Sequence, residues 1–407
     1  MFRTLMHLFN GNATDHNMET AGLVVGRPGR VMHIFAKVAA VVADEGALHA
    51  FYACKGAAGL KPCLLCTNVY QHSSVRDVVD NDATGVSVSH TCSDVSLLKL
   101  HTCATVAAVL RSLAHLAAQP KSKGKLEELE TCLGWRHDPG ALLSDGWLLP
   151  RVYPGAACIF DWMHVIFVNG VFGVAVGQLM RFAMHKDPCP CMVNLMSWRT
   201  AVPKDTGFKR RGLNYAAMHD AIVGFEWPQL VGTCADVFAP KRAASHWEDT
   251  TFKVSASEGL SVVPFMLYFM REAAAVVNDA SLDRHVSCFA QLCGIVQVLH
   301  GAPFYGVDTS ALQRDVGAFL AAFKGLYGDE VMTPKFHYMY CFARARVIES
   351  SLQRAHEGNM TTTIALATTT ATMMATMVMA TTLATTIARR STATRARMTN
   401  ATTTTWL

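Results

Sequence analysis

The sequence predicts a mixed α/β fold in which helices predominate. Two short apolar runs, at residues 31–43 and 156–160, each end at an aspartate, which is typical of buried strands that feed a helix. Apolar residues recur at helical spacing over residues 93–118, and residues 125–133 add a charged helix. We therefore expect short buried strands in one fold with several helices.

Composition indicates a globular protein with a large core. The chain has 407 residues, 51% of them hydrophobic and 16% charged, which allows two or three domains. Its net charge of +5 permits an anionic partner such as nucleic acid without itself indicating one. Its 13 cysteines follow no secretory signal, so we expect reduced thiols inside the cell rather than a disulfide framework.

Changes in composition divide the chain. The segment 359–407 is dominated by Thr, Ala and Met in near-repeats and has no acidic residue, and we expect a disordered low-complexity tail. The apolar run 165–180 is broken by Asn169 and three glycines and is shorter than a bilayer requires, which predicts a core helix and no membrane span. The expected parts are an N-terminal segment (1–30), a core (31–165), a helical insertion (166–250), a C-terminal helical part (251–358) and the tail (359–407).

A Cys-x-x-Cys pair is the clearest metal-binding motif. Cys63 and Cys66 follow Pro62 and the basic residues Lys55 and Lys61. Two thiolates at this spacing can bind one zinc ion from a tight turn, but zinc needs two further ligands. Because no second pair has clear spacing, a structural turn without metal stays equally open. The candidate partners are His49, Cys54, His72, His90 and Cys92.

Acidic residues follow both predicted strands, and a third lies in a later helix. Asp44 closes the first apolar run, and Asp161 closes the second, where His164 follows in the next turn. Functional residues of α/β sheets often lie at such strand ends. The alternative is purely structural: Asp161 caps the next helix and the His164 imidazole packs against the core. Glu258 lies in the apolar helical stretch 251–269, where a buried carboxylate requires either Lys253 or a metal ion as partner.

The middle of the chain holds the main basic cluster. Lys209, Arg210 and Arg211 lie between Cys189-Pro-Cys191 and the aromatic residues near Trp227. Basic residues beside aromatic ones can grip a DNA strand, while three cations in a solvated loop are the commoner arrangement.

In their order, these features resemble the catalytic region of eukaryotic cut-and-paste DNA transposases of the DDE type, most closely the CACTA and Plavaka-like groups. The likeness covers residues 30–340. It rests on Asp44, the Cys63-x-x-Cys66 knuckle, the box from Asp161 to His164, Glu258 followed by Pro264, and the stretch Thr333-Pro-Lys-Phe-His337.

The resemblance implies an RNase H-like core with a large helical insertion between Asp161 and Glu258, so that the chain would be mostly helical. It also implies metal-dependent cleavage and transfer of DNA strands. Asp44 and Glu258 would be the second and third catalytic carboxylates, shared by two Mg²⁺ or Mn²⁺ ions. Asp161 and His164 would shape the same cleft. Cys63 and Cys66, with zinc, would be structural or would position DNA, and Lys55, Lys61 and the cluster at 209–211 would contact it. Transposon-end DNA, a homo-oligomer and a nuclear location follow as expectations.

Two departures from the family pattern predict a defective remnant. Only 43 residues precede Asp44, and Asp15, the sole aspartate among them, lies in a polar segment, so the first catalytic carboxylate is expected to be missing. After His337 the family pattern also soon gives way to the tail. The alternatives are a non-catalytic DNA- or protein-binding remnant, and a zinc-stabilised helical protein unrelated to transposition. The zinc-stabilised helical protein would be favoured if Cys63 and Cys66 lay beside two other thiols or imidazoles while Asp44 and Glu258 lay far apart.

Overall fold

The computed structural model describes a large part of the chain. The described residues are 2–10, 22–27, 30–34, 40–72, 87–184, 234–248, 251–277 and 279–343, with single positions at 18, 218, 219 and 222. The chain divides after Val347, and all of these residues belong to the first unit. The predicted tail, the basic cluster at 209–211 and the Cys189-Pro-Cys191 segment lie outside the described residues.

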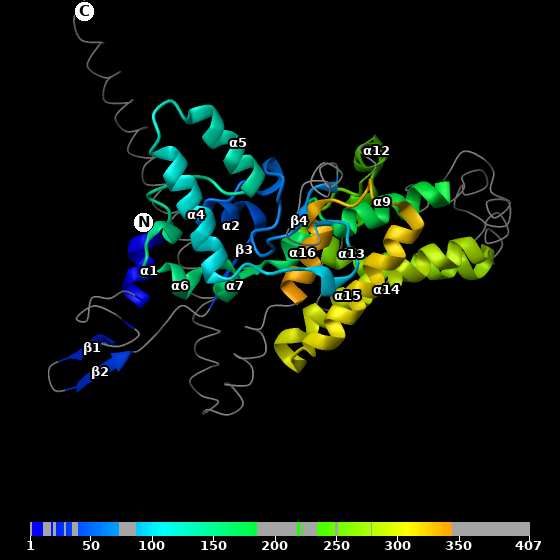
Figure 1. The fold of residues 1–407 in the computed structure, drawn as a ribbon. Coiled ribbons are helices and arrows are strands. Elements are labelled where there is room, and N and C mark those ends of the chain that lie inside the picture. The colour runs from blue at the N-terminus through cyan, green and yellow to red at the C-terminus, as the bar shows by residue number, and fades with distance from the viewer. Residues whose placement is uncertain are drawn as a thin grey trace, which may run out of the picture. The chain divides into compact units, whose positions relative to one another are not determined.

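Helices predominate, which confirms the mostly helical character that the sequence predicts (Figure 1). The helices are α1 (Phe2–Asn10), α2 (Glu45–Tyr52), α4 (Cys103–Ala117), α5 (Lys123–Leu133), α6 (Leu149–Val152), α7 (Pro154–Ala157), α8 (Trp162–Ile166), α9 (Val171–Met184), α12 (Pro240–Glu248), α13 (Ala256–Val277), α14 (Ala280–Tyr305), α15 (Thr309–Tyr327) and α16 (Pro334–Ala343). The strands are β1 (Leu23–Arg27), β2 (Arg30–Ile34), β3 (Val41–Ala43), β4 (Val69–Tyr70), β5 (Val88–Ser89) and β6 (Cys158–Phe160).

The described strands form three two-stranded sheets. β1 and β2 make an antiparallel hairpin, whereas β3 pairs with β6, and β4 with β5, in parallel. The predicted strand at 31–43 therefore contains most of β2 and all of β3, which belong to different sheets. The run is longer than an average strand of about 5–6 residues, and its apolar character alone could not show this division.

Helix α4 begins later than the apolar periodicity suggests. The Thr102 and Thr105 side chains form a reciprocal capping box, in which each hydroxyl accepts a hydrogen bond from the other residue's backbone N–H. This cap starts the helix at Cys103. The preceding residues instead run beside the Cys-x-x-Cys turn, where the Asn68 side chain donates to the Leu97 carbonyl at 2.8 Å.

The C-terminal helices pack in sequence and bury α16 among them. α13 packs on α14, α14 on α15 and on α9, and α15 on α16, which also contacts α8 and β6 (Figure 1). Every residue of α16 from Phe336 to Ala343 is buried, and Phe336 packs against Phe323 with ring centroids 4.7 Å apart. Helix α16 is therefore a central element of the core.

One stretch of the described chain, residues 162–183, has the length and hydropathy of a membrane span. It consists of α8 and α9, which are separated at Asn169, where φ is +45°. Of its most apolar window, 72% is buried inside the protein, as in the core helix that the sequence predicts.

Candidate metal centre

The Cys-x-x-Cys turn is held by backbone hydrogen bonds from two sides. The Leu65 N–H donates to the Cys63 Sγ at 3.3 Å, which closes the turn on itself. The Leu65 carbonyl accepts from His101 N at 2.8 Å, and Cys66 forms an isolated antiparallel bridge with Leu100. Hydrogen bonds within the protein therefore hold the backbone that presents both thiols.

Helix α16 supplies two further ligands. His337 and Cys341 are four residues apart, so their side chains lie on one face of the helix. Tyr338 fixes the height of the helix against the turn, because its hydroxyl donates to the Pro62 carbonyl at 2.9 Å and contacts Glu45 Oε1 at 3.0 Å. The Tyr340 hydroxyl donates to the Ser93 carbonyl and anchors the next turn of the helix.

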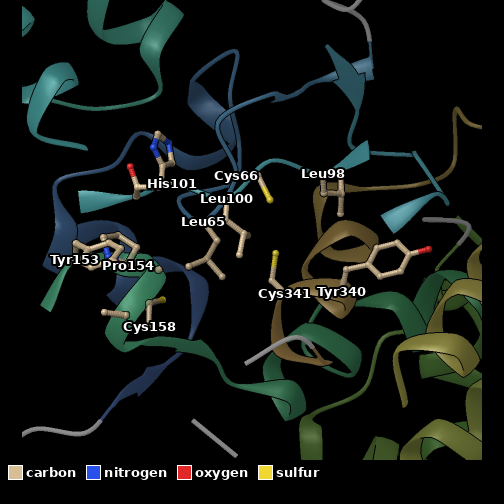
Figure 2. A pocket seen from close by; sticks show the side chains of 13 residues that line it. Leu65, Cys66, Leu98, Leu100, His101, Tyr153, Pro154, Cys158, Tyr340 and Cys341 are labelled. Atoms are coloured by element: carbon tan, nitrogen blue, oxygen red, sulfur yellow. The ribbon is translucent and has the colours of Figure 1, made fainter. Parts of the chain in front are cut away.

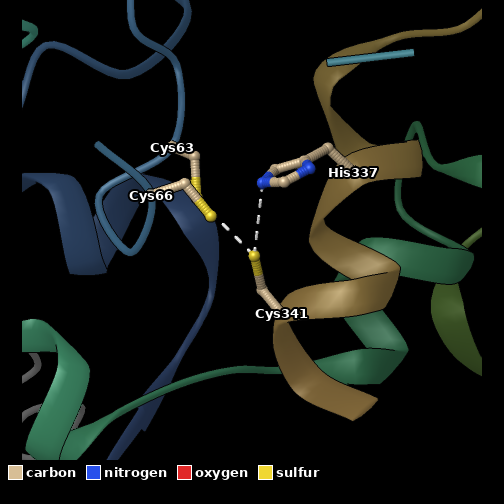
Figure 3. Close-up of side chains that lie close together, drawn as sticks. All are labelled: Cys63, Cys66, His337 and Cys341. Carbon is tan, nitrogen blue, oxygen red and sulfur yellow. Dashed lines mark hydrogen bonds between the residues drawn. The ribbon is translucent and has the colours of Figure 1, made fainter. Parts of the chain in front are cut away.

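The four side chains converge on one point, as Figure 3 shows. The ligand atoms of Cys63, Cys66, His337 and Cys341 all lie within 4.8 Å of one another, and no residue of the four is more than 6% exposed. The Cys341 Sγ lies 3.6 Å from the Cys63 Sγ and 3.5 Å from the His337 Nε2. These two distances match the roughly 3.5–3.8 Å that separates ligand atoms around tetrahedral zinc, and the donor set fits zinc in type and number.

The protonation of the thiols also suits a cation. Burial opposes the thiolate of Cys63, but hydrogen bonds from Cys341 and Cys66 outweigh it and lower its pKa well below the usual value. Burial, followed by the neighbouring Cys63, raises the pKa of Cys341. Without a cation these two shifts favour a thiolate at Cys63 beside a protonated Cys341. A divalent metal ion would hold all three cysteines as thiolates.

The sequence interpretation found half of this ligand set. Cys63 and Cys66 belong to the cluster, but the other two ligands are His337 and Cys341. The nominated partners, His49, Cys54, His72, His90 and Cys92, are not among the four. The signal for the missing half was the His-x-x-x-Cys spacing within the stretch after Pro334, since that spacing places both residues on one helical face.

The structure places Asp44 and Asp161 at neighbouring strand ends. β3 and β6 run parallel with Ala43 opposite Phe160, and the Asp161 N–H donates to the Ala43 carbonyl at 2.9 Å. Each aspartate caps the helix that follows: the Asp44 Oδ1 accepts from Ala47 N at 2.7 Å, and the Asp161 Oδ1 from Met163 N at 2.9 Å. Both acids therefore lie at the same edge of this sheet.

Glu258 lies in the first turn of α13 and is engaged by an arginine. Arg242 of α12 donates to both of its carboxylate oxygens, at 2.7 and 3.1 Å, and Ser255 adds bonds from its N–H and hydroxyl. The Arg242 bonds are the main cause that lowers the pKa of Glu258 to about 2. Arg242 was not foreseen as a partner, since it is 16 residues away in the sequence.

His164, Lys55 and Lys61 each contact other residues of the protein. Lys335 donates to the carbonyls of His164 and Val168 at 3.4 and 2.6 Å, so this lysine of α16 closes the turn after α8. The Lys55 Nζ lies 2.9 Å from the Thr131 Oγ1 and 3.5 Å from the Glu130 Oε2. Lys61 lies over the Tyr70 ring at 4.9 Å from its centroid.

Comparison with known proteins identifies no relative. The chain matches no protein-family model, no curated protein and no solved structure.

Proposed function

We propose that this chain is a zinc-binding protein in which Cys63, Cys66, His337 and Cys341 form a structural metal centre. The observation that carries the proposal is the convergence of four buried ligand atoms within 4.8 Å. Three thiolates and one imidazole are a common donor set for structural zinc, and four protein ligands leave no coordination position for a substrate. The zinc ion would supply folding energy rather than chemistry.

The metal centre is connected through Tyr338 to the strand ends that precede Asp44 and Asp161. Tyr338 lies between two ligands on α16, and its ring stacks on Phe160 of β6 with centroids 4.4 Å apart. Its hydroxyl contacts Glu45, which follows Asp44 directly. Zinc binding would hold α16 and, through Tyr338, the strand ends that carry Asp44 and Asp161.

For the wider role, we propose a remnant of a DDE-type transposase with an RNase H-like core. The parallel pairing of β3 and β6, with Asp44 and Asp161 at one edge, supports this proposal. In the ancestral reaction, Asp44 and Glu258 would bind Mg²⁺ or Mn²⁺ for strand cleavage and transfer of DNA in the nucleus.

The second candidate is a non-catalytic DNA- or protein-binding domain of the same origin. The bidentate Arg242–Glu258 pair favours it, because the arginine occupies both carboxylate oxygens that a metal ion would need. Catalysis would require Arg242 to leave Glu258.

Zinc content tests the metal centre. The full chain, purified without added chelator, is expected to contain one zinc per chain by elemental analysis, and to lose it in Cys66→Ser. Cys132→Ser is the matched control, because Cys132 is an exposed thiol on α5 and should leave the zinc content unchanged. A chain that folds without zinc and does not bind added zinc or cobalt would refute the proposal.

Plasmid cleavage separates the two wider roles. The full chain is incubated with Mg²⁺ or Mn²⁺ beside Asp44→Ala, Glu258→Ala and, as control, Glu128→Ala on the exposed face of α5. Cleavage that both site variants lose, and the control retains, supports a working nuclease. DNA binding without cleavage supports the non-catalytic remnant. If the chain neither binds nor cleaves DNA, a role on DNA is contradicted.

A further inference from the structure

A pocket of about 330 Å³ lies directly beside the metal centre. Two of the four ligands, Cys66 and Cys341, contribute to its wall, together with Leu100 and Ala156 nearer the surface. In Figure 2 the sulfur atoms of Cys66 and Cys341 point toward one another in the middle of the view. The pocket therefore leads from the surface to one thiol-bearing face of the cluster.

The other two ligands are less accessible from this side. Cys63 and His337 do not belong to the pocket wall. The Cys63 sulfur also accepts a hydrogen bond from the Leu65 N–H within its own turn, which reduces its electron density for reaction. A small molecule that enters the pocket would thus meet Cys66, Cys341 and Cys158, which also lines it. Burial raises the pKa of the Cys158 thiol, so Cys158 stays protonated, whereas zinc-bound cysteines are thiolates.

We propose that Cys66 and Cys341 are an oxidative modification site, at which hydrogen peroxide forms a disulfide and expels the zinc. The inference rests on the proposed zinc centre and adds its regulation. Susceptibility to peroxide follows thiolate character and access, and zinc-bound cysteines are thiolates. The pocket supplies the access.

The reaction balances in two steps. One thiolate attacks peroxide, its sulfur bonds to one oxygen as the O–O bond breaks, and hydroxide leaves, which gives a sulfenic acid. The second thiolate attacks that sulfur, the S–O bond breaks, and a second hydroxide leaves with the disulfide formed. Two electrons pass from the sulfurs to peroxide, and two protons from solvent convert the hydroxides to water. Only Cys63 and His337 would then remain to hold zinc, which are two of the four ligands that a structural site needs.

The disulfide would replace the metal as the link between the turn and α16. Both sulfurs already lie within 4.8 Å, so the two elements stay joined while the zinc is absent. A thiol reductant would restore the metal-binding form. The competing product is a Cys63–Cys341 disulfide, whose sulfurs are 3.6 Å apart. Both Cys63 and Cys66 are buried, and what favours Cys66 is that it belongs to the pocket wall and Cys63 does not.

The test starts from full chain with measured zinc content. Peroxide is added, zinc release is followed with a chromogenic chelator, and the free thiols are blocked before mass spectrometry. The expected result is zinc release in step with a Cys66–Cys341 disulfide, reversed by dithiothreitol and zinc. Fragmentation between Leu64 and Leu65 distinguishes Cys66 from Cys63. A disulfide that includes Cys63, or zinc retained under peroxide, overturns the inference, whereas absence of zinc at the start refutes the centre itself.

A pocket-filling variant tests the route. Ala156 is an exposed residue at the end of α7 that contributes to the pocket wall, so Ala156→Phe narrows the pocket without changing a ligand. Zinc release by peroxide should slow several-fold in Ala156→Phe, with full zinc content before oxidation. Ala156→Ser is the matched control and should release zinc at the unchanged rate. Equal rates in all three proteins would show that peroxide does not enter through this pocket.

Discussion

The Sγ atoms of Cys63 and Cys341 lie 3.6 Å apart although the residues are separated by 278 positions in the chain. Cys63 belongs to a turn near the start of the described core, and Cys341 to the last described helix. A metal ion bound at this point would close a loop that contains nearly the whole first unit. Metal binding and folding should therefore be strongly coupled.

Removal of zinc should lower stability without unfolding the turn itself. At free zinc one hundred times the dissociation constant, one site stabilises the folded state by about 2.7 kcal/mol. Dialysis against a chelator should therefore lower the midpoint of urea unfolding, and added zinc should restore it. The measurement is circular dichroism at matched protein concentration, with Cys66→Ser expected to show no response to zinc. An unchanged midpoint after proven zinc loss would contradict a structural role.

Two buried tyrosines should respond differently to loss of the hydroxyl. The Tyr338 hydroxyl is bonded to Pro62 and Glu45, so Tyr338→Phe leaves these acceptors unpaired and should destabilise the fold by about 1–3 kcal/mol. The Tyr52 hydroxyl is buried without a hydrogen-bond partner among the described residues, so Tyr52→Phe should be neutral or stabilising. Chemical denaturation of both variants gives the comparison, and equal losses would show that the Tyr338 bonds contribute nothing specific.

The Arg242–Glu258 pair should make part of the stability depend on pH. The arginine holds the pKa of Glu258 at about 2, below its ordinary value of 4.5. A depressed carboxyl pKa stabilises the fold above the ordinary pKa, and this stabilisation is lost as the pH falls from about 4.5 to about 2. Glu258→Gln should therefore be less stable at neutral pH and lose less on acidification. Urea unfolding at several pH values in this range measures the effect, with Glu128→Gln as control. If the free energy of unfolding changes with pH equally in wild type and Glu258→Gln, the Arg242–Glu258 pair does not contribute to the pH dependence.

Two glycines of one helix should respond to alanine in opposite ways. Gly134 ends α5 with φ at +76°, and a Cβ there would lie 2.5 Å from the Lys61 carbonyl oxygen. Gly134→Ala should thus be destabilising by more than about 1 kcal/mol and should disturb the segment before Cys63. Gly124 lies within α5 and a Cβ there meets nothing within 4 Å, so Gly124→Ala should stabilise by up to about 1 kcal/mol. The thermal unfolding midpoints of both variants test this prediction. An unchanged midpoint in Gly134→Ala would show that the backbone at Gly134 can relax.

Local sequence signals predicted much of the helical content. The periodicity at 125–133 corresponds to α5, and the apolar run ending at Asp161 contains β6. Where the prediction differed, a competing local or tertiary contact decided the outcome. The capping box at Thr102 delayed α4, and the 31–43 run was divided because its two halves pair with different strands.

The sequence by itself determined that the protein is mostly helical, that two short strands lead into aspartates, and that Cys63 and Cys66 are spaced to share a metal ion. These properties depend on residues a few positions apart, whose periodicity and spacing are visible along the chain. Only the tertiary structure decided that His337 and Cys341 complete the cluster and that Arg242 pairs with Glu258. Such pairings depend on how α16 packs against the turn and how Arg242 of α12 meets α13. The spacing of His337 and Cys341 indicates that they share a helical face, but only the packing decides which distant residues that face meets.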